Sequence, residues 1–276
     1  MVPPKAAATD LLGRFREVVS DPLNLLIERV PMAGVVEGNE VYLHNGNRVP
    51  VVGEHAYYGP FSQLLLINRG VHEPLEEYVF QQLIKILPEA PLMIELGAYW
   101  GHYSMWLKKL RPRASVILVD PDAASLATGE SNFRRNGFSG EFLRAFVGKG
   151  HLEIDSFRAD RMLAKIDILH ADVQGFEVEM LQGCRKSLSE RRVDYLLIST
   201  HTQEKHLAVV AALRDVGYRI EVASDFERET TSFDGFVFAS SPNAKNAFQK
   251  FSPLGRTTIV ESSPARLLQG LLEIAD

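Results

Sequence analysis

The chain has 276 residues, of which 46% are hydrophobic and 24% are charged. This is enough apolar material to bury a sizeable core without disulfides or metals, which excludes a disordered chain and a mini-protein. Thirty basic residues against 35 acidic ones give a formal net charge of −5, a field that does not attract a polyanion. We therefore expect one core domain with an appended segment and no nucleic-acid partner.

The cysteine content and the apolar runs predict a cytoplasmic protein without a membrane partner. Cys184 is the single cysteine and cannot form an internal disulfide, so we predict a buried small hydrophobe, with a reactive thiol as the alternative. The longest apolar runs, such as residues 116–119 and 195–198, are too short to cross a bilayer. Polar residues at positions 9 and 10 interrupt the N-terminal run before a secretory leader can form. The sequence indicates no oligomeric state.

Residues 1–73 are predicted to form an N-terminal extension. Extended segments at 41–44 and 48–52 flank Asn45-Gly46-Asn47, where Asn-Gly can take the positive φ angles of a tight hairpin turn. The extension can cap a pocket or be purely structural. His72 and Glu73, which precede the next helix, are placed to reach such a pocket from the cap.

Residues 74–240 alternate strand and helix patterns, which is typical of an α/β sheet with mostly parallel strands. A helix is predicted to start at Pro74, where the missing N–H is harmless, and to end near residue 87. The predicted strands are 92–96, 115–120, 141–147, 166–172, 193–200, 218–222 and 235–239. The predicted helices between them are 102–110, 123–136, 157–163, 176–188 and 204–216. Because no clear helix joins the last two strands, they are expected to form an antiparallel edge of a seven-stranded sheet.

Residues 241–276 are predicted to form a C-terminal loop followed by a short helix. The stretch 241–263 is rich in Ser, Asn, Pro and Lys, as loops are, and an apolar pattern follows at 264–274.

A glycine turn after the first core strand is the most informative stretch for function. Gly97 and Gly101 are spaced Gly-x-x-x-Gly, which matches neither the dinucleotide fingerprint nor the phosphate loop. We expect Gly97 to let the backbone approach a ligand and Gly101 to let the helix pack close to the strand. Glu95, directly before the turn, would repel a pyrophosphate but suits a ligand that carries an ammonium and a sulfonium, which favours S-adenosylmethionine. A strand-turn-helix unit without a ligand is the alternative.

An acid ends the next predicted strand. Asp120 lies 23 positions after Gly97, and a carboxylate there can accept both hydrogen bonds of a ribose diol. Its alternative is a cap of the following helix, a role that Asp122 could take instead. The predicted cofactor site is thus formed by Glu95, Gly97, Ala98, Tyr99, Gly101, Ser104, Asp120 and Pro121.

A third group of polar residues follows the next two strands. Alternation places His170 and Asp172 on one face of a strand, with Asp172 at its ligand-facing end, and His201 follows the neighbouring strand. We predict that His201 removes a proton from the acceptor and that Asp172 supports it, since an unperturbed imidazole titrates near ~6.5. Alternatively His201 caps the next helix, or His170, Asp172 and His201 hold a divalent metal. Glu177, in the first turn of its helix, is expected to be structural.

The motifs together resemble the FkbM family of methyltransferases over roughly residues 59–240. The resemblance is carried by four blocks: ELGAYWGHYS at 95–104, VDP at 119–121 with Asn132 and Asn136 downstream, DILHADVQGFE at 167–177 with LQG at 181–183, and DGFVFAS at 234–240. It implies a Rossmann-like class I methyltransferase fold, S-adenosylmethionine as the donor, and transfer to an oxygen of a small molecule such as a sugar or secondary metabolite. Two departures are His170, where the family usually has lysine, and residues 199–201, where it often has an acid.

Two other classes of function remain as alternatives. A nucleotide-dependent oxidoreductase is disfavoured by the missing third glycine and by Glu95. A catalytically inactive binding scaffold is mildly disfavoured, because such a protein has no need of Asp172 and His201 at the same mouth of a pocket.

Overall fold

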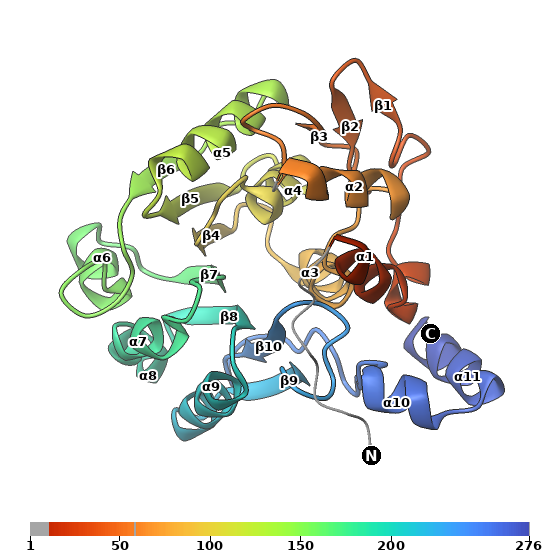
Figure 1. Cartoon of the computed structure of the whole chain (residues 1–276). Coiled ribbons are helices and arrows are strands. Elements are labelled where there is room, and N and C mark those ends of the chain that lie inside the picture. Colours follow the sequence, from red (N-terminus) through yellow and green to blue (C-terminus); the bar gives the residue numbers. More distant parts are fainter. Residues whose placement is uncertain (1–10, 58, 276) are drawn as a thin grey trace.

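The computed structural model describes residues 11–57 and 59–275, and it has an α/β architecture (Figure 1). Residues 9 and 10, at which the sequence predicts an interrupted leader, lie outside the described residues. The central sheet has seven strands in the order β6-β5-β4-β7-β8-β10-β9. Their bounds are β4 (Leu92–Leu96), β5 (Ser115–Asp120), β6 (Glu141–Arg144), β7 (Ile166–Ala171), β8 (Val193–Thr200), β9 (Arg219–Ser224) and β10 (Gly235–Ser240).

The strand order confirms the predicted class I methyltransferase topology. The five strands from β6 to β8 pair in parallel, and β10 lies antiparallel between β8 and β9. The chain moves from β4 outward to β5 and β6, and then returns to place β7 on the other side of β4. This reversal next to β4 is the switch point at which open α/β sheets bind ligands, outside the carboxyl ends of the strands.

Helices cover both faces of the sheet, and an apolar core fills each interface (Figure 1). One core contains Phe80, Trp106 and Phe133 from the first three helices that flank the sheet, and the other contains Met180 and Val209 from the helices opposite. The first face carries α3 (Pro74–Ile86), α4 (His102–Leu110) and α5 (Ala123–Arg135), and the second carries α6 (Ile154–Asp160), α7 (Glu177–Gln182), α8 (Arg185–Ser189) and α9 (Gln203–Asp215). Cys184 is fully buried, as predicted.

The structure corrects the predicted helix 176–188, which is two helices with a break at Gly183 and Cys184. Asp155 of α6 stabilises this break, because its carboxylate accepts the backbone N–H groups of Lys186 and Ser187 at 2.8 and 2.7 Å. Its own N–H donates to the carbonyl of Gly183 at 2.9 Å. The preceding helix begins at Ile154 rather than 157, so that the fully buried Ile154 is part of it.

The N-terminal segment forms the predicted hairpin and several short elements that its sequence did not predict. β2 (Glu40–Tyr42) pairs antiparallel with β3 (Arg48–Pro50), and β1 (Val36–Glu37) adds a third strand. Gly46 has φ +80°, but the connection spans residues 43–47, so it is wider than a two-residue turn. The additional helices are α1 (Leu11–Val19), η1 (Pro22–Leu25), η2 (Gly59–Ser62) and α2 (Gln63–Ile67).

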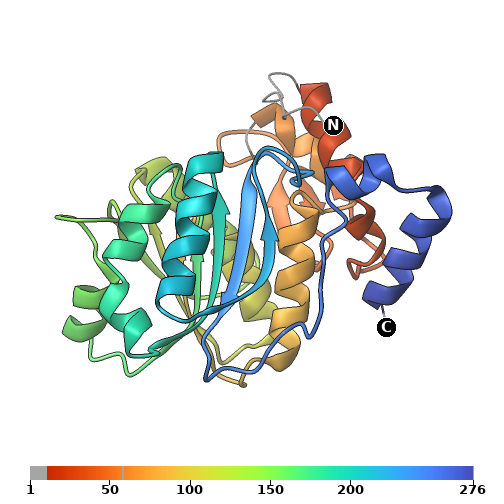
Figure 2. The ribbon, with the colours of Figure 1, turned by 90° about the horizontal axis from the view of Figure 1, so that it is seen from below.

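The C-terminal segment has two helices where the sequence predicts one. α11 (Pro264–Ala275) is the predicted helix, whereas α10 (Arg256–Glu261) falls in the predicted loop. α10 buries no residue, so it has no apolar stripe from which it could be recognised. In both views the two helices lie on the side of the molecule that carries α1 (Figure 1, Figure 2). Within the described part of the chain, each helix is too short or too polar to span a membrane.

Candidate active site

A cavity of about 460 Å³ opens at the carboxyl ends of β4, β5 and β7, at the switch point of the sheet. The turns after these strands form its floor, and α3 and the N-terminal segment close it from the other side. Tyr57 and His72 belong to residues 1–73, so the extension contributes to the wall, and His72 and Glu73 reach the pocket as expected.

The glycine turn after β4 is held by two close backbone approaches. Gly97 has φ +71°, and a Cβ at this position would overlap the carbonyl oxygen of Asp172, so the turn packs on the β7 loop. Gly101 has φ +73°, and its Cβ would lie 3.0 Å from Leu118 of β5 and from Phe133 of α5. The prediction that Gly101 allows close packing is confirmed. Gly97 lines the cavity, but the atom closest to its Cβ position is the backbone carbonyl oxygen of Asp172.

Asp120 ends β5 with its carboxylate at the cavity. Its Oδ2 accepts the N–H of Tyr99 at 3.1 Å and its Oδ1 accepts the N–H of Asp122 at 2.9 Å. Burial raises the pKa of Asp120 above its ordinary value. Asp122 caps α5 by accepting the N–H of Ser125 at 2.8 Å, so the alternative role considered for Asp120 belongs to its neighbour.

Glu95 lies in β4 and is 2% exposed. Its Oε2 accepts the N–H of Ser104 at 3.1 Å, which ties the strand to the first turn of α4. Burial raises the pKa of Glu95, because the charged form is poorly solvated there. An added positive charge in the cavity would favour the ionised form.

Asp172 and His201 lie together at the mouth of the cavity, as the sequence predicts. Glu177 is the third member of this group of charged side chains. Nδ1 of His201 donates to Oε1 of Glu177 at 2.5 Å, and Nε2 lies 3.1 Å from Oδ1 of Asp172. Burial alone would lower the pKa of His201, but its pairing with Asp172 and Glu177 raises it to about 10. The imidazole is therefore protonated at neutral pH, which argues against the prediction that it removes a proton from the acceptor. Glu177 helps to hold His201 in this state.

His170 forms a second buried ion pair. Its Nε2 lies 2.5 Å from Oε1 of Glu76 in α3, and the hydroxyl of Ser199 donates to Oε2 of Glu76 at 2.9 Å. Burial opposes protonation, but the charge of Glu76 raises the pKa of His170 to about 9. Protonated His170 thus supplies a positive charge at the position where the resemblance implies lysine. Glu76 of α3 places a carboxylate at the end of β8, where the resemblance implies an acid and this chain has Ser199.

The alternative metal set His170, Asp172 and His201 is not assembled among the described residues. Their ligand atoms do not all lie within 4.8 Å of one another, and the two imidazoles are paired with different carboxylates. The set is therefore not supported as a metal site.

Most of the predicted cofactor residues line the cavity, namely Glu95, Gly97, Ala98, Tyr99, Asp120 and Pro121. Gly101 and Ser104 lie behind the turn and support it, and His201 contacts Asp172 without lining the cavity itself. Sequence reasoning missed Glu76, Gln174 and Phe146, which also line it. Glu76 is one of two adjacent acids in the first turn of α3, a helix that also contains Gln81 and Lys85, so its sequence does not mark it as a site residue, and nothing distinguishes Phe146 either.

A smaller cavity of about 240 Å³ adjoins the first at Asp172. Its wall combines aromatic rings with carboxylates and shares Tyr57, Glu73, Asp172 and Gln174 with the larger cavity. The additional members are Phe61, Phe233 and Asp234. Asp172 therefore lies between the two cavities.

Comparisons with known proteins identify several similar solved structures. A precorrin-6y methyltransferase from Geobacter metallireducens is 17% identical, with 59% of this chain and 87% of that chain covered and a TM-score of 0.43. A ribosomal protein L11 methylase from Lactobacillus delbrueckii subsp. bulgaricus is 14% identical, with 62% and 80% covered and a TM-score of 0.45. TrmK of M. capricolum, in complex with S-adenosyl-homocysteine, is 13% identical, with 71% and 81% covered and a TM-score of 0.42.

No curated protein matches the chain. The sequence profile described as "Methyltransferase FkbM domain" matches residues 68–220, more than half of the chain and all of the strands β4 to β8. The chain belongs to the FkbM methyltransferase family.

Proposed function

We propose that this protein transfers a methyl group from S-adenosylmethionine to a hydroxyl of a small acceptor, such as a sugar or a secondary metabolite. The observation that carries the proposal is the convergence of Glu95, Asp120 and Asp172 on one cavity at the switch point of the sheet. This arrangement suits a donor that bears two positive charges and a ribose, and it is unsuited to a pyrophosphate. A cytoplasmic location fits this role and stays a prediction.

The donor would bind along the turns after β4 and β5. Each oxygen of Asp120 accepts one backbone N–H and retains a second lone pair, so the carboxylate can receive both ribose hydroxyls. Glu95 would face the ammonium of the methionine part, and the positive charge would offset the cost of burying the carboxylate. Phe146 and Val147 give the same cavity an apolar wall for the adenine ring.

The acceptor would bind in the smaller cavity, with Asp172 between it and the donor. His201 and the side-chain amide of Gln174 both contact Oδ1 of Asp172, at 3.1 Å each. Oδ2 is thereby left to the acceptor hydroxyl. We therefore propose Asp172 as the group that receives the hydroxyl proton and His201 as a positioning residue, which reverses the roles predicted from sequence. Residues 1–73 would cap this space through Tyr57 and Phe61.

The reaction would be an in-line displacement, in which the acceptor oxygen forms a bond to the methyl carbon as the carbon–sulfur bond breaks. Orientation of the two reactants can contribute about 7–11 kcal/mol. A positioned base contributes roughly 10²- to 10⁴-fold in rate, about 3–5 kcal/mol. Alignment by the cavity is therefore the larger effect, and loss of the base should slow the reaction without abolishing it.

Incubation with methyl-labelled S-adenosylmethionine and a panel of hydroxylated small molecules tests this proposal. We expect label in a product that contains one additional O-methyl group, with formation of S-adenosylhomocysteine. Label on a nitrogen or carbon atom would contradict O-methyl transfer. Donor binding without transfer to any acceptor in a broad panel would instead favour the inactive scaffold.

A further inference from the structure

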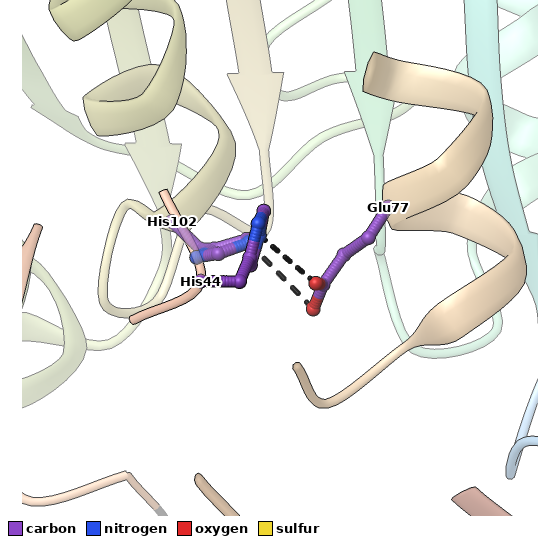
Figure 3. A group of neighbouring side chains, drawn as sticks. All are labelled: His44, Glu77 and His102. Atoms are coloured by element: carbon purple, nitrogen blue, oxygen red, sulfur yellow. Dashed lines mark ion pairs between the residues drawn. The ribbon is translucent and has the colours of Figure 1, made fainter. Parts of the chain in front are cut away.

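Three buried side chains from separate segments converge behind the cofactor cavity (Figure 3). His44 comes from the loop between β2 and β3, Glu77 from α3, and His102 from the first turn of α4. Their side chains are at most 2% exposed. One ligand atom of each lies within 4.8 Å of the corresponding atoms of the other two.

The polar atoms of this cluster are not satisfied by hydrogen bonds. Both ring nitrogens of His44, both of His102, and Oε2 of Glu77 are buried without a hydrogen-bond partner among the described residues. Buried polar groups are nearly always paired, so five such atoms in one place require an explanation. His44 Nε2 and Oε2 of Glu77 lie 3.0 Å apart and form an ion pair.

The spacing of the three ligand atoms fits a metal ion. Zinc binds imidazole nitrogen and carboxylate oxygen at about 2.0–2.2 Å, which places neighbouring ligand atoms of a tetrahedron about 3.3 Å apart. His44 Nε2 lies 3.0 Å from Oε2 of Glu77, His102 Nε2 lies 3.7 Å from the other oxygen, Oε1, and one ligand atom of each residue lies within 4.8 Å of the other two. We propose that His44, Glu77 and His102 bind a divalent transition-metal ion of the zinc type.

The surroundings hold the three ligands in place. Oε1 of Glu77 accepts the backbone N–H groups of His72 and Glu73, at 2.9 and 3.2 Å, which fixes the carboxylate. Trp100 stacks on the ring of His102 and Trp106 packs edge-on against His44, with ring centroids 5.0 and 4.3 Å apart. Such supporting contacts orient metal ligands in known sites. Two imidazoles with one carboxylate suit zinc-type ions better than Mg²⁺.

The position of the site indicates what the metal does. It joins the N-terminal hairpin to α3 and to the start of α4, three segments that otherwise contact through side chains. His102 follows Gly101 and lines the cofactor cavity, so the ion would fix the end of the glycine turn. Because the ligands are buried, the proposed role is structural, and the ion would take no direct part in the transfer chemistry.

The test is titration of the metal-depleted full chain with Co²⁺, followed by displacement with Zn²⁺. Trp100 and Trp106 are the two tryptophans of the chain, and both contact ligand rings, so their fluorescence reports on this site. We expect Co²⁺ to bind at one equivalent, to quench the tryptophan fluorescence and to show the intense visible bands of a four-coordinate ion. Zn²⁺ should reverse both signals and raise Tm by several degrees, and Mg²⁺ should do neither.

The variants His44→Gln and Glu77→Gln should each weaken Co²⁺ binding at least about 10- to 100-fold. His55→Gln is the matched control, since His55 and Glu54 form an imidazole–carboxylate pair outside the cluster, 3.6 Å apart, and this variant should bind Co²⁺ as the parent chain does. The proposal is overturned if the parent chain shows neither quenching nor four-coordinate bands, or if His55→Gln abolishes them. Because those signals come from the parent chain, they test the proposal even where a variant fails to fold.

Discussion

The backbone of Gly97 packs so closely against the carbonyl oxygen of Asp172 that only hydrogen fits between them. Gly97 belongs to the turn that we assign to the donor, and Asp172 is the group that we assign to the acceptor. In addition, the N–H of Asp172 donates to the carbonyl of Leu96 at 2.9 Å. The two halves of the proposed reaction are therefore fixed relative to each other by backbone contacts.

Gly97→Ala should disrupt both stability and activity. The new methyl group would overlap the Asp172 carbonyl, and the residue has φ +71°. We expect a loss of about 2–5 kcal/mol in unfolding free energy, measured by urea denaturation. Any folded fraction should transfer methyl groups poorly, because the Asp172 loop must move.

Gly137→Ala is the matched control for Gly97→Ala. Gly137 has nearly the same backbone angle, φ +73°, but nothing lies within 4 Å of its Cβ position. The Gly137→Ala variant should lose only about 1–2 kcal/mol of unfolding free energy through backbone strain, and it should keep its activity. Equal losses for the two variants would show that the contact with Asp172 is unimportant.

Asp120→Asn should weaken the binding of S-adenosylhomocysteine about 10- to 100-fold, as expected for the loss of charged hydrogen bonds to the ribose. Asp122→Asn should leave that affinity unchanged, since Asp122 caps α5 and asparagine also caps helices well. Calorimetric titration of S-adenosylhomocysteine into both variants distinguishes the roles of the two acids. A similar weakening in both would mean that Asp120 does not hold the ribose.

Much of the core could be predicted because its signals are local. The strands 92–96, 115–120 and 193–200 have their predicted bounds, since buried parallel strands are short apolar runs between turn residues. The helix cap at Asp122, which leaves Asp120 to face the cavity, also followed from neighbouring residues. Elements without an apolar stripe, such as α10, left no such signal.

Asp172→Asn should lower kcat by about 10²- to 10⁴-fold and leave the affinity for the donor nearly unchanged. The reason is that the amide cannot receive the proton of the acceptor hydroxyl. Single-turnover kinetics together with calorimetry measure the two quantities separately. An unchanged kcat would exclude Asp172 as the base.

The pH dependence of kcat/KM distinguishes Asp172 from His201 as the base. A neutral imidazole base would give a loss of activity as the pH falls below ~6.5. We expect no such loss, because His201 is already protonated, and we expect activity to fall instead above about pH 9–10, where His170 and His201 lose their protons. An acid limb near pH 6.5 that disappears in His201→Gln would restore the prediction made from sequence.

Stability should fall as the pH rises from near neutrality. The pKa of His201 is raised from 6.5 to about 10 on folding, so its ion pairs contribute fully below pH ~6.5 and are lost as the pH approaches 10. His170 acts in the same direction, with a pKa of about 9. The unfolding free energy of His201→Gln should therefore depend less on pH between these limits than that of the parent chain. Parallel pH curves for the two proteins would contradict the ion-pair assignment.

The state of the site residues could not be predicted from the sequence, because it depends on partners that are distant in the chain. His201 looks like a base until Glu177 and Asp172 are seen on its two nitrogens. The protonated form of His170 is stabilised by the charge of Glu76, which is 94 positions away in the sequence. His44, Glu77 and His102 share no spacing motif, since three separate elements bring them together.

Calorimetric titration of S-adenosylmethionine into the folded chain is the most direct test of the proposed donor site. We predict saturable binding at one site per chain, with affinity that falls in Asp120→Asn and in Glu95→Gln. An absence of binding, or an affinity that neither substitution changes, would contradict the assignment of this cavity to a cationic methyl donor.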